Sequence, residues 1–522
     1  MVRKNLSKNI LSPVDNAWLR MELPTNLMMI TGVFFIDQPI ELAAIKEIMG
    51  SRLLRFQRFR QRIKQPRFSW LPAYWEDDSH FDINSHVHRI ALPAPGNQSA
   101  LQELINDFMA TPLDFSKPLW QIHLVENYGD GCALLCRLHH CIGDGVALMR
   151  VLFSLTDDMA NPDEQQTNKT DRSRSRTTNN GQKVRPFSSV LARTSKNGNL
   201  LVKRGLERLA DPGQLLAGLK FGAESSAALA NLLLLSPDPE TPYKGELGVA
   251  KRCAWTRPLL LSDVKEVGRV CGGTVNDVLL TAVAGALGKY LRSRGEPIGG
   301  LNFRAVVPVN LRPADEELKL GNSFGLIFLS LPVGIEDPLD RLYELKKRMD
   351  AIKGTPEAIV AYGILNAIGI ASREIEDIVV GLFGQKATTV MTNVPGPKEV
   401  RFFAGRPIKG LMFWVPQSGR LGLGVSILSY AGTVLIGVAT DAALTPDPES
   451  IVALIHGEFE ELMDLVRMAK ESDAEMAGEE PDQELCEAIT LSGNRCKNKA
   501  RENSRYCYKH QKYVVLDASI AP

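Results

Sequence analysis

The spacing of hydrophobic residues predicts two α/β lobes. In the first lobe, up to about residue 157, helical spacing and short apolar runs indicate helices over 42–51 and 99–109 and buried strands over 29–36 and 132–138. In the second lobe, from about residue 251 to 469, strand-like and helical stretches alternate. Strands are expected at 303–309, 326–332 and 433–440, and helices at 275–292, 338–352 and 450–469.

Between the lobes the composition changes abruptly. Residues 157–183 are polar and contain almost no large apolar side chains, so burial cannot offset the entropy of ordering them. We therefore assign 1–157 to an N-terminal lobe, 158–189 to a disordered linker, and 190–470 to a helical connector with a C-terminal lobe. The helical patterns over 190–235 fit either core-facing helices or a face lying on a membrane.

Composition excludes several classes of protein. The 522 residues are 44% hydrophobic and carry 61 basic against 60 acidic side chains, so no global charge draws the chain to nucleic acid. The first residues lack the apolar core of a secretory signal, and no apolar stretch reaches the ~18–20 residues of a spanning helix. We expect a cytoplasmic protein that associates peripherally with membranes.

The sharpest chemical signal is a pair of histidines at the end of a predicted strand. The run 132–138 leads into His139 and His140, followed by a turn with Asp144 and Gly145 and then an amphipathic helix. A loop after a strand is where a scaffold holds reactive groups in place. Because the unperturbed pKa of histidine lies near neutrality, one imidazole here could act as a general base.

Other interpretations of this loop are weaker. Adjacent residues on an extended chain point to opposite faces, so His139 and His140 are poorly placed to share a zinc ion. The G-x-S-x-G pattern of a serine hydrolase occurs at residues 321–325, but there it leads into a predicted strand, whereas the nucleophile of such an enzyme lies on a turn from a strand into a helix. Asp144 suits the N-cap of the following helix, and either histidine alone could be a hydrogen-bonded structural residue. What remains is a base that activates a substrate directly.

Around this loop the sequence resembles a known family. His139-His140-x-x-x-Asp144-Gly145 resembles the HHxxxDG motif of CoA-dependent acyltransferases. Four further stretches resemble bacterial wax ester synthase/diacylglycerol acyltransferases, in that family's order, and the match extends from residue 11 to about 469. They are Leu11-Ser-Pro-Val-Asp15 with Glu22-x-Pro24-Thr25-Asn26, Pro118-Leu119-Trp120, Asn276-Asp277, and Asn393-Val-Pro395-Gly396-Pro397. The resemblance implies two acyltransferase-like α/β lobes.

Carried over to this chain, the resemblance implies a role for each residue of the loop. His140, the second histidine, would be the catalytic general base, with His139 beside it. Asp144 would hold the loop, usually through an arginine, and Arg312 is a candidate for that partner. Gly145 leaves space beside the imidazole because glycine has no Cβ.

The remaining motif residues are expected to bind substrate or to support the site: Trp120, Asn276, Asp277, Asn393, Pro395 and Gly396. Local structure explains part of each motif. Asp277 fits a capping box at a helix start, the prolines around Gly396 fit a rigid turn, and Trp120 fits core packing. The resemblance adds that Asn276 lies at the active site and that the turn helps build the substrate channel. Apolar stretches at 324–331, 412–415 and 421–427 suit either a substrate tunnel or the core.

A separate signal lies near the C-terminus, in residues 484–513. Cys486, Cys496, Cys507 and His510 have the spacing of Zn ligands, and three thiolates with one imidazole make a closed tetrahedral site. So short a segment has little hydrophobic core of its own and would need a bound metal ion to stabilise its fold. The pattern resembles small Cys-x9-Cys-x10-Cys-x2-His modules appended to assorted bacterial and phage proteins. The alternative is four unconnected side chains on a basic tail, and its positive charge suits an anionic partner.

The resemblance implies an O-acyltransferase that moves a long-chain acyl group from acyl-CoA to a fatty alcohol, giving a wax ester, or to diacylglycerol, giving triacylglycerol. Catalysis by His140 would need no cofactor and no acyl-enzyme. Expected partners are these substrates, a membrane or lipid-droplet surface, and a second copy of the chain in a homodimer. Two alternatives stay open: condensation on a carrier protein, and an inactive scaffold that binds lipid or nucleic acid.

Overall fold

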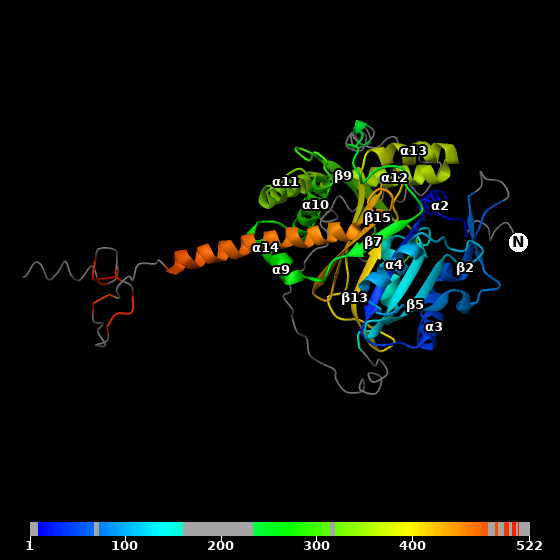
Figure 1. Cartoon of the computed structure of the whole chain (residues 1–522), viewed down its shortest axis with the longest axis horizontal. Coiled ribbons are helices and arrows are strands. Elements are labelled where there is room, and N and C mark those ends of the chain that lie inside the picture. The colour runs from blue at the N-terminus through cyan, green and yellow to red at the C-terminus, as the bar shows by residue number, and fades with distance from the viewer. Residues whose placement is uncertain are drawn as a thin grey trace, which may run out of the picture. The chain divides into compact units, whose positions relative to one another are not determined.

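The computed structural model describes residues 9–66, 72–159, 232, 234–313, 319–478, 486–488, 495–498, 500, 504–507 and 510. Nearly all of the predicted linker at 158–189 and of the helical patterns over 190–235 lies outside these residues. The chain divides into two compact units, Met1–Leu462 and Met463–Pro522. Within the described part of the first unit, strands form two large sheets and one small hairpin (Figure 1).

The first sheet has the strand order β12-β13-β1-β6-β5-β4. Its strands are β1 (Met29–Ile36), β4 (Val87–Ala91), β5 (Trp120–Tyr128), β6 (Gly131–His139), β12 (Phe402–Phe403) and β13 (Arg406–Trp414). The antiparallel register of β6 and β1 places His139 opposite Met29. On the other side of β1 lies β13, so the second half of the chain supplies two strands of this sheet.

The second sheet has the order β10-β9-β11-β14-β15-β7, and β8 also pairs with β15. Its strands are β7 (Lys251–Trp255), β8 (Leu259–Leu260), β9 (Phe303–Asn310), β10 (Phe324–Leu331), β11 (Thr389–Pro395), β14 (Leu423–Tyr430) and β15 (Thr433–Asp441). β11 is parallel to both of its neighbours, β9 and β14. The separate hairpin joins β2 (Gln61–Lys64) to β3 (Tyr74–Asp77).

The helices of the first half are α2 (Pro13–Arg20), α3 (Leu42–Ser51), α4 (Gln98–Met109) and α5 (Gly145–Ser154), with 3-10 turns η1 (Leu53–Arg55), η2 (Gln57–Arg60) and η3 (Ile83–Ser85). Those of the second half are α9 (Leu261–Val270), α10 (Val275–Ser293), α11 (Pro338–Ile352), α12 (Glu357–Ile370), α13 (Arg373–Gln385) and α14 (Pro448–Gly478). The helices predicted at 42–51, 99–109, 275–292 and 338–352 begin and end within one residue of α3, α4, α10 and α11, whereas α14 extends nine residues beyond the predicted end at 469. Among the described helices, none alone is long and apolar enough to cross a membrane. Only α9 and α10 taken together, with a bend of 95° between them, reach that length and apolar composition.

Every residue of strand β1 is buried, which explains the largely apolar sequence at 29–36. Ile30 and Phe34 face one hydrophobic cluster, which includes Leu148 of α5. Val33 faces a second cluster, which includes Trp255 of β7. Because successive side chains of a strand point to opposite faces, β1 is buried on both sides, and no position along it tolerates a charge.

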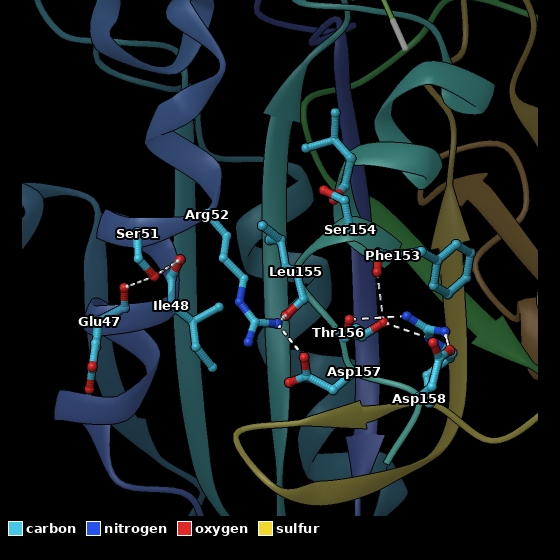
Figure 2. A network of polar contacts seen from close by, with 12 residues as sticks. Glu47, Ile48, Ser51, Arg52, Phe153, Ser154, Leu155, Thr156, Asp157 and Asp158 are labelled. Atoms are coloured by element: carbon cyan, nitrogen blue, oxygen red, sulfur yellow. Dashed lines mark hydrogen bonds and ion pairs between the residues drawn. The ribbon is translucent and has the colours of Figure 1, made fainter. Parts of the chain in front are cut away.

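The C-terminal end of α5 is held by arginines from two distant segments. Arg52 donates hydrogen bonds of 2.9 Å to the carbonyl of Leu155 and to the carboxylate of Asp157 (Figure 2). Arg401 donates to the hydroxyl and the carbonyl of Thr156. Since α5 begins at the histidine loop, these contacts fix the far end of the helix that carries the loop.

Candidate active site

His139 and His140 lie at the end of β6, where segments from both halves of the chain meet. The backbone N–H of His139 donates to the carbonyl of Leu119, and that of His140 donates to the carbonyl of Met28 at 2.7 Å. His139 is fully buried, whereas His140 keeps 6% of its surface exposed. The backbone of the pair is therefore fixed by its neighbours, and only His140 retains contact with solvent.

Both ring nitrogens of His139 are engaged in hydrogen bonds. Nδ1 accepts from the backbone N–H of Cys141 at 3.1 Å, so the ring proton lies on Nε2 and is donated to the carboxylate of Glu22 at 2.8 Å. The same carboxylate accepts from the N–H of Met28 at 3.1 Å. Because both ring nitrogens are engaged, His139 stabilises the loop and has no free lone pair for a substrate.

His140 occupies an apolar environment that keeps it neutral. Its imidazole stacks on the indole of Trp18, with ring centroids 4.0 Å apart, and Phe324 approaches to 5.8 Å. Burial lowers the pKa of His140 to about 4, although the carboxylate of Asp144 acts in the opposite direction. At neutral pH the ring is therefore unprotonated, which is the form a general base needs.

Asp144 has two structural functions at once. One carboxylate oxygen caps α5 by accepting from the N–H of Ala147 at 2.9 Å. The other accepts from the N–H of Ser323 at 2.9 Å and forms an ion pair with Arg312, the candidate named from sequence. The ion pair is almost completely buried, with the two side chains 5% and 7% exposed. The loop is thus tied both to α5 and to the second half of the chain.

A short segment of the second half, residues 321–323, lies directly against the histidine loop. Gly321 accepts from the N–H of Asp144 at 3.2 Å and donates to the carbonyl of Ile142 at 3.1 Å. Its φ of +118° is a conformation that side chains other than glycine's rarely adopt. Asn322 donates from Nδ2 to the carbonyl of His140 at 2.9 Å and to Asp15 at 2.8 Å.

The sequence patterns gave no role to Trp18, Glu22 or Asn322 in the loop, although each contacts a histidine. Asp15 and Glu22 belong to the N-terminal motif that carried part of the resemblance, and that motif was the available signal. Asp15 is fully buried and forms an ion pair of 2.9 Å with Arg58. The motif therefore supplies the acidic groups that hold the loop from the N-terminal side.

An apolar cavity lies beside Gly145. A Cβ built on Gly145 would meet no atom within 4 Å, so the missing side chain leaves open space. The cavity is lined from β1, β6, α5 and β13, by Ile30, Gly32, Val33, Phe34, Leu138, Gly145, Leu148, Met149, Leu152, Leu411, Met412 and Phe413. Of the stretches expected from sequence to line a tunnel, 412–415 contributes here, whereas Phe324 contacts the imidazole instead.

Two of the expected supporting residues come together across the second half of the chain. Nδ2 of Asn393 donates to Oδ1 of Asn276 at 2.6 Å. Asp277 forms the predicted capping box with Thr274 at the start of α10. Among the described residues, no hydrogen bond joins Asn276 or Asn393 to His140, so a direct part in the chemistry stays a prediction.

The other supporting residues have clear packing roles. Trp120 is fully buried and donates from Nε1 to the carbonyl of Phe59 at 2.9 Å, which fits core packing. Pro395 ends β11, and Gly396 donates to the carbonyl of Ser429 at 2.7 Å. A Cβ on Gly396 would lie 2.5 Å from that carbonyl oxygen, so the turn after β11 requires glycine.

The four expected metal ligands of the second unit also come together. The ligand atoms of Cys486, Cys496, Cys507 and His510 all lie within 4.8 Å of one another. Nδ1 of His510 lies 3.5 Å from Sγ of Cys486 and 3.3 Å from Sγ of Cys507. Such a group could hold a metal ion, which excludes the alternative of four unconnected side chains.

Comparison with known proteins identifies the family. The chain belongs to the wax ester synthase/diacylglycerol acyltransferase family, because the catalytic domain of that description matches residues 11–279 and the C-terminal domain matches residues 320–463. It is therefore an O-acyltransferase. A probable diacylglycerol O-acyltransferase of Mycobacterium tuberculosis, tgs1, is 29% identical over 453 residues, which cover 84% of this chain and 92% of the relative.

Solved structures show the same fold. The wax ester synthase/diacylglycerol acyltransferase from Marinobacter aquaeolei VT8 matches with a TM-score of 0.61 at 21% identity, over 88% of this chain and 99% of the other. The first condensation domain of the calcium-dependent antibiotic synthetase matches with a TM-score of 0.55 at 14% identity, over 88% and 96%. At such low identities these matches establish the architecture alone.

Proposed function

We propose that the protein transfers a long-chain acyl group from acyl-CoA to the hydroxyl of a fatty alcohol or of diacylglycerol, with His140 as the general base. The observation that carries this proposal is the contrast between the two histidines. Both nitrogens of His139 are occupied, whereas His140 is neutral, keeps 6% of its surface exposed and is stacked in an apolar environment. The names of the relatives support the choice of substrates.

The proposed reaction is a direct transfer in which His140 carries one proton. Its imidazole takes the proton of the alcohol while the alcohol oxygen attacks the thioester carbon, giving a tetrahedral oxyanion. The carbon–sulfur bond then breaks, and the imidazolium returns the proton to the leaving CoA thiolate. A low pKa of His140 favours this second step, because it makes the imidazolium a strong acid.

The apolar cavity beside Gly145 is small, about 20 Å³, which is room for about one water-sized group. Its lining side chains are hydrophobic throughout, and burying one methylene group contributes about 0.8 kcal/mol. The polarity of this lining suits an acyl chain, and we assign the cavity to at most a short part of one. A carrier-protein reaction has only the shared condensation-domain fold in its favour.

Peripheral membrane association is supported by the unusual orientation of α13. Its Glu376 is buried, with a side chain 1% exposed, and pairs with Arg20 of α2. The opposite side presents Ile375, Ile378 and Leu382, which are 52%, 70% and 39% exposed and spaced three and four residues apart. An apolar helical face turned outwards is suited to a lipid surface, which is where diacylglycerol and fatty alcohols reside.

We propose Zn²⁺ as the ion of the Cys486–Cys496–Cys507–His510 group, in a structural role. Tetrahedral zinc has bonds of ~2.3 Å to sulfur and ~2.0 Å to nitrogen. Its ligand atoms are therefore about 3.8 Å apart where both are sulfur and about 3.5 Å apart where one is nitrogen. The Sγ atoms of Cys496 and Cys507 are 3.9 Å apart, and the two contacts of His510 are 3.5 and 3.3 Å. Four protein ligands leave no open position for a substrate.

Exposed basic residues beside this group support an anionic partner for the second unit. Arg495, Lys497 and Arg505 are all exposed.

The expected homodimer also stays a proposal, to be tested by sedimentation of the purified protein.

An acceptor panel tests the proposed function. Purified protein with palmitoyl-CoA is offered hexadecanol, dioleoylglycerol or monoacylglycerol, and the release of free thiol is followed. We expect acceptor-dependent thiol release with at least one of hexadecanol and dioleoylglycerol, together with the matching ester. Thiol release that is the same without any acceptor would indicate a thioesterase and would contradict the proposal.

A further inference from the structure

Two buried atoms beside the histidine loop lack a partner. Nδ1 of His140 and Oδ1 of Asn322 are both inaccessible to solvent and have no hydrogen bond of normal geometry. Leaving a buried polar atom unpaired costs about 1–3 kcal/mol, so two such atoms in one site call for an explanation. One is a nitrogen that can carry a proton, and the other is an oxygen that can only accept one.

The orientation of the Asn322 side chain is determined by its neighbours. Nδ2 donates to Oδ1 of Asp15 at 2.8 Å and to the carbonyl of His140 at 2.9 Å. Both partners accept here, and the other oxygen of Asp15 forms an ion pair with Arg58. Turning the amide over would place its oxygen against a carboxylate, so the nitrogen must face Asp15 and the oxygen must be Oδ1 as assigned.

The amide is also within reach of the imidazole. Its Nδ2 is bonded to the backbone carbonyl of the same histidine. Burial lowers the pKa of His140, and the carboxylate of Asp144, the backbone carbonyl of His140 and the side chain of Asn322 as an acceptor all act in the opposite direction. Trp18 stacks on one face of the ring and Phe324 lies 5.8 Å away at a tilt of 56°, and neither side chain offers an acceptor atom. Two acceptors therefore lie near the imidazole, the backbone carbonyl of His140 and the side-chain oxygen of Asn322.

We propose that Asn322 is a positioning residue that holds His140 in one tautomer, with Oδ1 accepting the proton of Nδ1 so that Nε2 keeps its lone pair for the alcohol. This inference rests on the proposed role of His140 as the base. A neutral imidazole has one proton to place, and a ring protonated on Nε2 would present a donor to the substrate and could not take its proton. Asn322 belongs to the second half of the chain, so that half contributes to the basicity of a histidine in the first.

The tautomer can be measured directly by NMR. Protein labelled with ¹⁵N-histidine gives long-range ¹H–¹⁵N correlations in which protonated and bare ring nitrogens have very different shifts, and His140→Ala identifies the signals of His140. At pH 7 we expect the wild type to show a protonated Nδ1 and a bare Nε2. We expect Asn322→Ala to show a mixture of tautomers or a protonated Nε2. Its kcat should fall on the order of 10- to 100-fold, with the KM for palmitoyl-CoA little changed.

Gln417 offers a matched control. Its buried side chain donates to the carbonyls of Gly422 and Ala439, and its oxygen is likewise without a partner. Gln417→Ala therefore removes a comparable set of buried bonds without touching the histidine loop. We expect it to lower the melting temperature as Asn322→Ala does, but to leave the His140 tautomer unchanged.

Two results would overturn the inference. The first is a wild-type His140 that carries its proton on Nε2, a measurement that does not depend on whether any variant folds. The second is an Asn322→Ala protein with the wild-type tautomer and kcat, which would mean that the backbone carbonyl of His140 alone holds the ring. If His140→Ala keeps full activity, the proposed function itself fails. An inactive His140→Ala with an unaltered tautomer in Asn322→Ala rejects only the role of Asn322.

Discussion

The indole of Trp18 lies flat on the imidazole of His140, with ring centroids 4.0 Å apart and planes inclined by 19°. Trp18 comes from α2, near the N-terminus, and His140 follows β6, so the contact joins two distant segments. The stacked ring excludes water from one face of the imidazole. Exclusion of water penalises the charged form, which is the main cause of the lowered pKa of His140.

Removing the indole should therefore change the pH profile. In the wild type, with a His140 pKa of about 4, kcat/KM should decline only well below pH 6.5. In Trp18→Ala water reaches the ring, so the pKa should rise towards the ordinary value and the acid limb should move to higher pH. Trp18→Phe keeps an aromatic ring over the imidazole and should retain the wild-type profile. Superimposable profiles for all three proteins would show that Trp18 does not set the pKa.

Asp144 should contribute to stability more than its capping role explains. Asp144→Ala removes the cap of α5 and also leaves Arg312 buried without its partner, a change that typically costs ~3–5 kcal/mol. Asp337 is a suitable control, because it caps α11 in an exposed position, where loss of a cap costs about 1 kcal/mol. In urea unfolding, Asp144→Ala should lose clearly more free energy of unfolding than Asp337→Ala. Equal losses in the two variants would mean that the ion pair with Arg312 adds nothing to stability.

The local elements were predictable because each depends on residues close together in the sequence. The helix at 42–51 and the strand at 29–36 follow directly from apolar spacing and coincide with α3 and β1. The pairing of β13 with β1 was not predictable, since strand pairing at long range leaves no periodic signal in one sequence. The same holds for Asn322, which reaches the histidine loop from 182 residues away.

The candidate site was predictable where its residues lie close together in one sequence motif. His139, His140 and Asp144 lie within six consecutive residues. Arg312 is a candidate partner of Asp144 from the sequence, and the two side chains form an ion pair. The contact between Asn276 and Asn393 combines two motifs that sequence treats separately. Trp18 gave no signal, because an isolated tryptophan on an amphipathic helix is equally typical of a core residue.

The exposed face of α13 should be needed for binding to lipid. Ile375→Asp combined with Ile378→Asp places two charges on that face while the buried Glu376–Arg20 pair remains. We expect this variant to lose flotation with phosphatidylcholine vesicles that contain dioleoylglycerol. Tyr343→Asp, on an exposed position of α11, is the control and should float as the wild type does. Unchanged flotation of the double variant would exclude α13 as the lipid-binding face.

Loss of a proposed zinc ligand should affect the second unit and not the chemistry. Cys496→Ser should lose the bound metal, whereas Cys271→Ser, at a cysteine outside the ligand group, should keep it. Metal content per chain is measured by mass spectrometry, and acyl transfer is followed by thiol release. We expect Cys496→Ser to keep most of its transferase activity. A soluble Cys496→Ser protein with no activity would show that catalysis depends on this module.

The central claim is that His140 takes the proton of the acceptor alcohol, and replacing it is the most direct test. The measurement is the rate of thiol release from palmitoyl-CoA with the best acceptor, for wild type, His140→Ala and His80→Ala, an exposed histidine away from the loop. Because general-base catalysis contributes on the order of 10²- to 10⁴-fold, His140→Ala should lose at least ~100-fold while remaining folded. His80→Ala should match the wild type. A folded His140→Ala protein with a wild-type rate would contradict the account.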